Sequence, residues 1–240
     1  MSFKGRSVLA VVPARGGSKS IPRKNLALVG GLSLVARAAA VVAALPWIDE
    51  GLISTDSDEI MAEAVAHGLD APFTRPPEHS GDTAGSAAMW KHAWLSAEEH
   101  YQRRFDISVL LEPTSPLRRP EDVERTVAAV VDGGHLAAAT VSRTPAHFTP
   151  HKTLTVSPEG VIGFYLAEGA RHSLRQSIPS YFHRNGLCYA LTRAALVDRG
   201  HILEEDCAAV VIDRHVVNID EPFELELAEF LLRRESAGRA

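Results

Sequence analysis

The sequence predicts an α/β fold built on a doubly wound, mostly parallel sheet with helices on both faces. Short apolar runs typical of buried strands alternate with helical segments over the first 142 residues. A basic loop with two adjacent glycines follows the first apolar run, at the position where such folds bind phosphate groups. The alternation stops near residue 143 and resumes near residue 181, which indicates an inserted segment.

The first apolar run, residues 8–12, predicts a buried parallel strand, and the basic loop at 13–25 follows it directly. Glycine lets a backbone approach an anion closely, and lysine and arginine balance the anion's charge. The loop lacks both the Walker A pattern and the dinucleotide-binding glycine fingerprint. A surface turn explains one or two solvated cations, but this loop holds four in a chain with a net charge of -5. We therefore interpret it as a phosphate site, whose cations are Arg15, Lys19, Arg23 and Lys24.

The following segments repeat the alternation of strand and helix as far as residue 142. Capping residues, acids in first turns and helical spacing of apolar side chains predict the helices. Met89, Trp90 and Trp94 lie at helical spacing, which is typical of core packing. The predicted helices are 33–45, 57–67, 86–101 and 120–131, and the predicted strands are 52–54, 71–74, 107–111 and 136–141.

Residues 143–180 contain no long amphipathic helix but include alternating runs at 152–156 and 161–166. This pattern predicts a small β-rich insertion in a main domain formed by residues 1–142 and 181–240. An insertion of this size has little core of its own, so we expect it to pack on a second copy of the chain. Beyond it, the sequence predicts strands at 187–191, 208–213 and 215–219, a short helix at 193–199 and a closing helix at 221–234.

Polar side chains gather where the predicted strands end. Asp56 follows the second strand, Arg75 the third, Glu112 the central strand and Asp220 the last one. The carboxyl ends of parallel strands meet at one edge of a sheet, so this mixture of cations and carboxylates suits a triphosphate with a divalent metal. Asp56 and Asp220 also precede helices, and each alone is as consistent with a helix cap as with a ligand.

Composition limits the class of protein. The chain is 45% hydrophobic and 23% charged, as in an ordinary globular protein, and its net acidity argues against nucleic-acid binding. Cys188 and Cys207 stand singly, which suggests neither a disulfide framework nor a zinc site. No apolar run approaches the ~20 residues that cross a membrane, and the N-terminal sequence lacks a signal-peptide pattern. We expect a cytoplasmic protein without a membrane partner.

Six sequence blocks resemble the acylneuraminate cytidylyltransferases, that is, the CMP-N-acetylneuraminate synthetases and their close relatives. The blocks are PARGGSKSIPRKN, ISTDSDEI, RPPEHSGDTAGS, LLEPTSPLR, RQSIPSYFHRNGLCYA and NIDEPFELELAE, in the family's order. The resemblance implies a nucleotide-diphospho-sugar transferase-like fold and a homodimer whose inserted dimerisation segment reaches toward the partner's site. It also implies transfer of CMP from CTP to an acidic nine-carbon α-keto sugar of the N-acylneuraminate type, with Mg²⁺ as cofactor.

The same resemblance implies roles for individual residues. The nucleotide contacts would be Ala14, Arg15, Asn25, Arg75 and Ser86, with Lys19 and Lys24 facing the triphosphate. The sugar contacts would be Glu112, Lys152, Arg175 and Tyr189, and Asp220 would bind the metal. Arg15, Lys24 and Asp220 are the residues expected to act in catalysis, two on the leaving pyrophosphate and one through the metal.

The chain departs from the family pattern at several positions. Glu112 stands where relatives often have Gln, His183 where sialate enzymes commonly have Arg, and Asn218 where a second Asp is frequent. Residues 207–209 offer none of the aromatic side chains that relatives place near the sugar's acyl group. These departures keep legionaminic, pseudaminic and deaminated sialic acids open as substrates. They also leave open a nucleotide-sugar-binding protein without catalysis.

Overall fold

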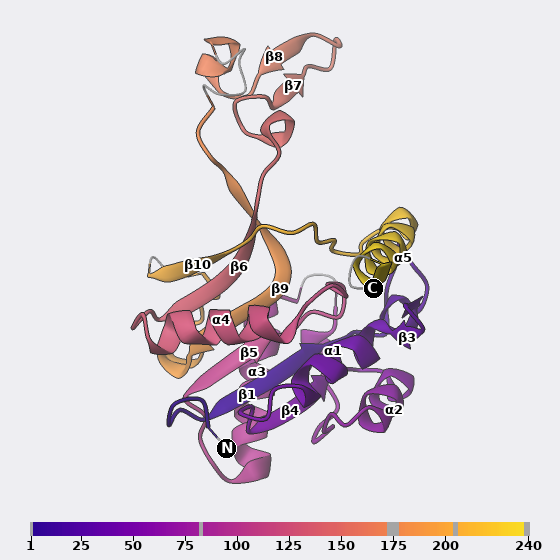
Figure 1. Cartoon of the computed structure of the whole chain (residues 1–240), viewed down its shortest axis with the longest axis vertical. Helices are drawn as coiled ribbons and strands as arrows, with labels where there is room; N and C mark the ends of the chain where they lie inside the picture. The colour runs from indigo at the N-terminus through magenta and orange to yellow at the C-terminus, as the bar shows by residue number, and fades with distance from the viewer. Residues whose placement is uncertain (1, 82–83, 172–177, 204–205, 238–240) are drawn as a thin grey trace.

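The computed structural model describes residues 2–81, 84–171, 178–203 and 206–237. Its centre is a six-stranded sheet in the order β10-β6-β9-β5-β1-β4 (Figure 1). Neighbouring strands run parallel except at β9, which is antiparallel to both β5 and β6. The mostly parallel sheet is therefore confirmed, with one reversed strand. The strands are β1 (Val8–Pro13), β4 (Glu50–Ser54), β5 (Ile107–Leu110), β6 (Ala137–Arg143), β9 (Phe182–Thr192) and β10 (Cys207–Ile212).

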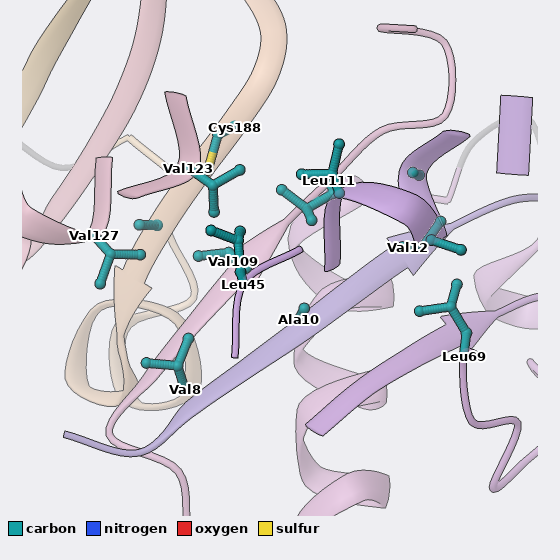
Figure 2. Packing of buried hydrophobic residues seen from close by; sticks show 14 of the residues in the cluster. Val8, Ala10, Val12, Leu45, Leu69, Val109, Leu111, Val123, Val127 and Cys188 are labelled. Atoms are coloured by element: carbon teal, nitrogen blue, oxygen red, sulfur yellow. The ribbon is translucent and has the colours of Figure 1, made fainter. Parts of the chain in front are cut away.

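Helices cover both faces of the sheet, as a doubly wound fold requires. Alternate residues of β1 point to opposite faces, so Val8 and Val12 join one buried cluster while Leu9 and Val11 join the other. Figure 2 shows the first cluster, where β1 and β5 pack against Val123 of the helix above them. The helices are α1 (Leu34–Ala43), α2 (Asp58–Ala66), α3 (Ser86–Tyr101), α4 (Pro120–Val131) and α5 (Pro222–Ala237). The first cluster contains residues of α1, α2 and α4, and the second is covered by α3.

Local sequence signals fix several element ends. The Ser33 hydroxyl accepts a hydrogen bond from the Ala36 N–H at 2.9 Å and so caps α1. Ser57 caps α2 in the same way, and Gly68 follows that helix with a φ of 88°. Pro120 opens α4, where its missing N–H costs nothing.

Two predicted strands are wrong. Near 71–74 the structure has only a single bridge, between Asp70 and Leu52, because Pro72 offers no N–H to continue a ladder. Residues 215–219 form no strand, and the Ile219 N–H donates at 2.8 Å to the carbonyl of Thr114, which lies beyond the end of β5. The short helix predicted at 193–199 is a π-helix, Ala194–Arg199.

An arm, defined here as residues 144–181, projects from the ends of β6 and β9 away from the sheet (Figure 1). Its described part contains a hairpin of β7 (Leu154–Val156) and β8 (Ile162–Phe164) with short turns of 3-10 helix at Ala146–Phe148 and Ala167–Arg171. None of its described side chains belongs to a buried apolar cluster. The division into a main domain and a dimerisation insertion remains a prediction.

The remaining described elements are short. A 3-10 turn, η1 (Lys24–Leu26), and a small hairpin of β2 (Leu28–Val29) and β3 (Leu32–Ser33) connect the basic loop to α1. A second 3-10 turn, η2 (Pro77–His79), lies between β4 and α3. Among the helices of the described residues, none has the length and apolarity to cross a membrane.

Candidate functional site

A cleft of about 220 Å³ opens at the carboxyl ends of β1 and β5. Its walls include Pro13 and Leu110, the last residues of those strands. Open α/β sheets bind their ligands at this end. Six residues predicted from the sequence line it together: Arg15, Lys24, Asn25, Arg75, Ser86 and Glu112.

The basic loop is held in place by its own backbone. The Ala14 N–H donates to the Ser54 carbonyl at 2.9 Å, and the Gly16 N–H donates to the Asp56 carboxylate at 2.8 Å. The Asn25 amide donates to the Arg15 carbonyl at 3.0 Å and closes the loop on itself. Asp56 therefore anchors the loop, while the adjacent serine, not Asp56, caps α2.

Arg75 supplies a fixed positive charge next to the loop. Its side chain is buried and donates to the hydroxyl and carbonyl of Ser54, with the Nε–Oγ distance at 3.0 Å. The pKa of Arg75 is lowered to about 10, mainly by burial. The charge of Asp56 opposes this effect, and the charge of Arg15 adds to it. Since the guanidinium stays protonated at neutral pH, the cleft keeps a buried cation suited to an anionic ligand. Ser86 begins α3 at the same wall, so the positive end of that helix dipole also faces the cleft.

Lys24 and Asp220 meet at the cleft rim. The Lys24 ammonium donates to the Ile219 carbonyl at 2.9 Å and to the Asp220 carboxylate at 3.1 Å. The Lys24 side chain is 13% exposed and that of Asp220 is 70% exposed. At the start of α5 the Glu224 carboxylate accepts from the N–H groups of Asp220 and Glu221 at 2.5 and 2.8 Å, and the Asp220 carboxylate bonds to Lys24. The Asp220 carboxylate is thus open to solvent and to a ligand.

Glu112 lines the cleft, and the buried Arg118 holds the backbone on which Glu112 lies. Arg118 is buried and donates to the carbonyls of Glu112, Gly186 and Leu187. Burial lowers the pKa of Arg118 to about 10. Burial also raises the pKa of Glu112, an effect that Asp220 strengthens and that Arg118, Arg184 and Lys24 oppose. Sequence reasoning missed Arg118, whose only signal was its position in the polar exit loop of the central strand.

The other predicted residues lie outside the cleft lining. Tyr189 is buried in β9 opposite Leu110, and burial, with Glu112 adding, raises the pKa of its hydroxyl to about 12. Ala14 is buried behind the loop, and Lys19 is exposed on it. Lys152 lies in the arm, on a different part of the molecule from the cleft. Arg175 lies outside the described residues.

The donor groups at the rim suit a magnesium ion shared with a ligand. No group of three or more His, Cys, Asp or Glu side chains within the described ranges could hold a metal by itself. Mg²⁺ is commonly held by one or two carboxylates together with substrate phosphates and water. Asp220 offers one exposed carboxylate beside the cations that suit phosphate, so the residues present fit that arrangement.

A larger cavity, of about 460 Å³, lies at the opposite end of the sheet. It is lined by Ile107 and Leu136, at the start of β5 and just before β6, and by none of the predicted residues. Two of its basic side chains are paired, Arg193 with Glu98 at 3.0 Å and His135 with Asp206 at 2.6 Å. The smaller cleft is the better candidate, because the strand ends and unlike charges converge there.

Comparisons with known proteins identify the family and the fold of the chain. A family model described as cytidylyltransferase matches residues 9–156. The chain is 28% identical to "CMP-N,N'-diacetyllegionaminic acid synthase" of Legionella pneumophila, covering 94% of this chain and 96% of that protein. It is 27% identical to "Pseudaminic acid cytidylyltransferase" of Campylobacter jejuni, with the same two coverages. The solved structure of CMP:2-keto-3-deoxy-manno-octonic acid synthetase complexed with CTP superposes with a TM-score of 0.71 at 18% identity, covering 95% of this chain and 99% of that chain. At that identity the superposition shows the fold alone.

Proposed function

Because the chain belongs to the cytidylyltransferase family, we propose that it transfers CMP from CTP to a hydroxyl of an acidic nine-carbon sugar and releases pyrophosphate. The observation that carries this proposal is the convergence of Arg15, Lys24 and Arg75 on one cleft at the carboxyl ends of β1 and β5. Three cations in one cleft of an acidic chain match the charge of a nucleoside triphosphate.

The nucleotide side of the reaction follows from the cleft. Arg75, Asn25 and Ser86, with the backbone at Ala14, would hold the cytidine nucleotide. Arg15 and Lys24 would bind the β- and γ-phosphates, with Lys19 approaching from the exposed side of the loop. The sugar hydroxyl oxygen attacks the α-phosphorus, the bond to the β-phosphate oxygen breaks, and the hydroxyl proton passes to solvent. Catalysis then consists mainly of positioning the two reactants and neutralising the leaving group.

Magnesium would bind at Asp220 together with the phosphate oxygens. Bound there, it would neutralise charge that builds up on the phosphates. The Lys24–Asp220 pair, at 3.1 Å, must separate for this to happen. Arriving phosphates attract Lys24 away from the carboxylate, so the nucleotide itself favours an open Asp220. Arg15, Lys24 and Asp220 are therefore the residues to which we assign catalysis.

The part of the site that binds the sugar includes Glu112 and the neighbouring Tyr189 of one chain. We propose that the arm of a second copy of the chain supplies the rest of this part. Lys152 lies in the arm, whose exposed apolar side chains resemble an unpaired interface: Phe148, Leu154, Val156, Val161, Ile162, Phe164 and Tyr165. In a homodimer these side chains would be covered, and Lys152 and Arg175 would reach the partner's cleft to pair with the sugar carboxylate.

Relatives named for two different nine-carbon acids match this chain over nearly its whole length. An N-acylneuraminate is one candidate substrate, and legionaminic or pseudaminic acid is the second. The acid at Glu112, where the resembling family often has Gln, favours keeping the second candidate. The two candidates undergo the same reaction at the same hydroxyl and differ in the rest of the sugar.

A pyrophosphate-release assay tests the function directly. The chain is incubated with CTP, Mg²⁺ and a panel of N-acetylneuraminic, legionaminic, pseudaminic and deaminated sialic acids. Release with one sugar far above the others identifies the substrate. Nucleotide binding without release for any sugar of the panel would contradict the proposal and favour a binding protein.

Mixing inactive variants tests the shared site. If each arm serves the other subunit's cleft, a 1:1 mixture of Arg15→Ala and Lys152→Ala subunits, dissociated and reassociated, regains about one quarter of wild-type activity. Half of the resulting dimers then carry one intact site out of two. No regain above the separate variants would contradict an arm that serves the other subunit's cleft.

A further inference from the structure

Gly186 lies where β9 passes under the cleft, at a bulge in its pairing with β6. The pairing register shifts between Ala139 and Val141, leaving Gly186 in the irregular part of the ladder. Its φ of 70° is in the left-handed region, which favours glycine. A Cβ at this position would lie 2.7 Å from Glu112 Oε2 and 2.7 Å from Ser115 Oγ, closer than real Cβ atoms approach. Both the backbone and the space therefore require the absence of a side chain.

The space that Gly186 leaves is taken by the Glu112 carboxylate. The backbone of Glu112 is fixed, since its carbonyl accepts from Arg118 at 2.5 Å and from the Ser115 N–H at 3.1 Å. Its carboxylate, by contrast, accepts no hydrogen bond from the residues that the structure describes, although Arg118 and Arg184 are near enough to act on its charge. A partly buried acceptor without a donor is costly in free energy. This carboxylate lines the cleft and is ready for a donor from a ligand.

We infer that Gly186 is a positioning residue for sugar selection: by leaving room for Glu112, it creates a subsite that takes a hydrogen-bond donor of the sugar. This inference rests on the proposed function. An ionised carboxylate can only accept hydrogen bonds, so the subsite fits a hydroxyl or an amide N–H. It rejects a carboxylate or carbonyl oxygen. The sugar's own acid group must then face cations elsewhere, in keeping with its proposed pairing with Lys152 and Arg175.

Gly186→Ala tests this inference, using the sugar that the panel identifies. The added methyl group should push the carboxylate aside and raise KM for the sugar by about tenfold or more, while KM for CTP changes less than about twofold. Gly134→Ala is the matched control, because Gly134 has a φ of 71° and nothing within 4 Å of its Cβ position. It imposes the same backbone strain without the contact, and its KM values should stay at the wild-type level.

A double-mutant cycle separates positioning from packing. If Gly186 acts through Glu112, the Gly186→Ala effect on KM for the sugar disappears when Glu112 is already Ala. Since Ser115 Oγ is equally close to the Cβ position, Gly186→Ala is also combined with Ser115→Ala, which should leave the loss of sugar affinity in place. Rescue by Ser115→Ala, equal effects on both KM values, or independent effects of Gly186→Ala and Glu112→Ala would overturn the inference.

Two further measurements test the inference if Gly186→Ala folds poorly or if no sugar of the panel reacts. Glu112→Gln replaces one acceptor oxygen by a donor, so it should change the order of kcat/KM among the sugars and leave KM for CTP unchanged. An unchanged order would contradict the donor subsite. If no sugar reacts, the proposed function fails first. Urea unfolding still tests the contact, because Gly186→Ala should destabilise more than Gly134→Ala and Glu112→Ala should reduce the excess.

Discussion

The cleft end of the sheet and the arm differ in how completely one chain builds them. β1 is buried along its length, packed on both faces, and delivers the basic loop to a fixed place. The arm is tied to the fold by two strands and leaves Val156, Val161 and Ile162 exposed on a two-stranded hairpin. A hairpin without a packed face is marginal in water. The cleft is therefore formed within one chain, while the arm leaves an apolar surface that the proposed dimer would cover.

The largest effect should come from removing a cation of the cleft. Arg15→Ala should lower kcat/KM for CTP by about 100- to 1000-fold, because a desolvated charge contact to phosphate is lost. Arg23→Ala is the matched control, since Arg23 belongs to the same loop but pairs with Glu59 outside the cleft. Steady-state pyrophosphate release measures both variants. Activity of Arg15→Ala within twofold of wild type would remove this loop from the site.

The second largest effect should come from the arm. Ile162→Asp puts a charge on the apolar surface and should dissociate the dimer, which sedimentation velocity detects, while CTP binding persists. Val65→Asp is the control, because Val65 is also an exposed apolar side chain but lies on α2. A monomeric wild-type chain at micromolar concentration, or a dimer unaffected by Ile162→Asp, would break the contrast between the two regions.

A smaller effect is expected at the cleft rim. Asp220→Asn keeps the shape of the side chain but removes its charge, so the Mg²⁺ concentration for half-maximal activity should rise about tenfold. Glu221→Gln removes the neighbouring exposed acid and should leave the magnesium titration unchanged. Identical titrations for Asp220→Asn and wild type would take Asp220 off the list of metal ligands.

The smallest effect concerns stability. Burial raises the pKa of Glu112 above its ordinary value, so its stabilising contribution is full below the unfolded-state pKa and is lost as pH rises through the folded-state pKa. Ionising this buried carboxylate as the pH rises thus costs stability, and Glu112→Gln should be more stable than wild type at pH 7. The difference should shrink as the pH falls through the folded-state pKa and be smallest at about pH 4, below the unfolded-state pKa of about 4.3. Urea unfolding at both pH values checks this, and a variant less stable at pH 7 would contradict the account of the subsite.

Much of the fold was predictable, because the relevant signals are local. The predicted bounds of α3 and α4 agree with the structure, since helical spacing and the proline at residue 120 fix them. The reversal of β9 was not predictable from its own residues, because a buried apolar run carries no direction. The arm sets its direction, because it leaves the sheet at the carboxyl end of β6 and returns the chain at that same end.

The candidate site divides in the same way. Arg15, Lys24 and Asn25 lie in one stretch of sequence, so a single motif predicts their convergence. Arg118 ties the Glu112 carbonyl to those of Gly186 and Leu187, which are about 70 residues away in the sequence and brought close by β9. The role of Gly186 likewise depends on a side chain from another strand end, and no spacing rule reveals such a contact.

The most direct test of the central claim is a crystal structure of the chain with CTP and Mg²⁺. The account predicts the triphosphate between Arg15 and Lys24, the nucleoside beside Arg75 and Ser86, and the metal on Asp220 after its separation from Lys24. Nucleotide density at the opposite end of the sheet, beside Arg104 and His135, with the Lys24–Asp220 pair intact, would contradict it.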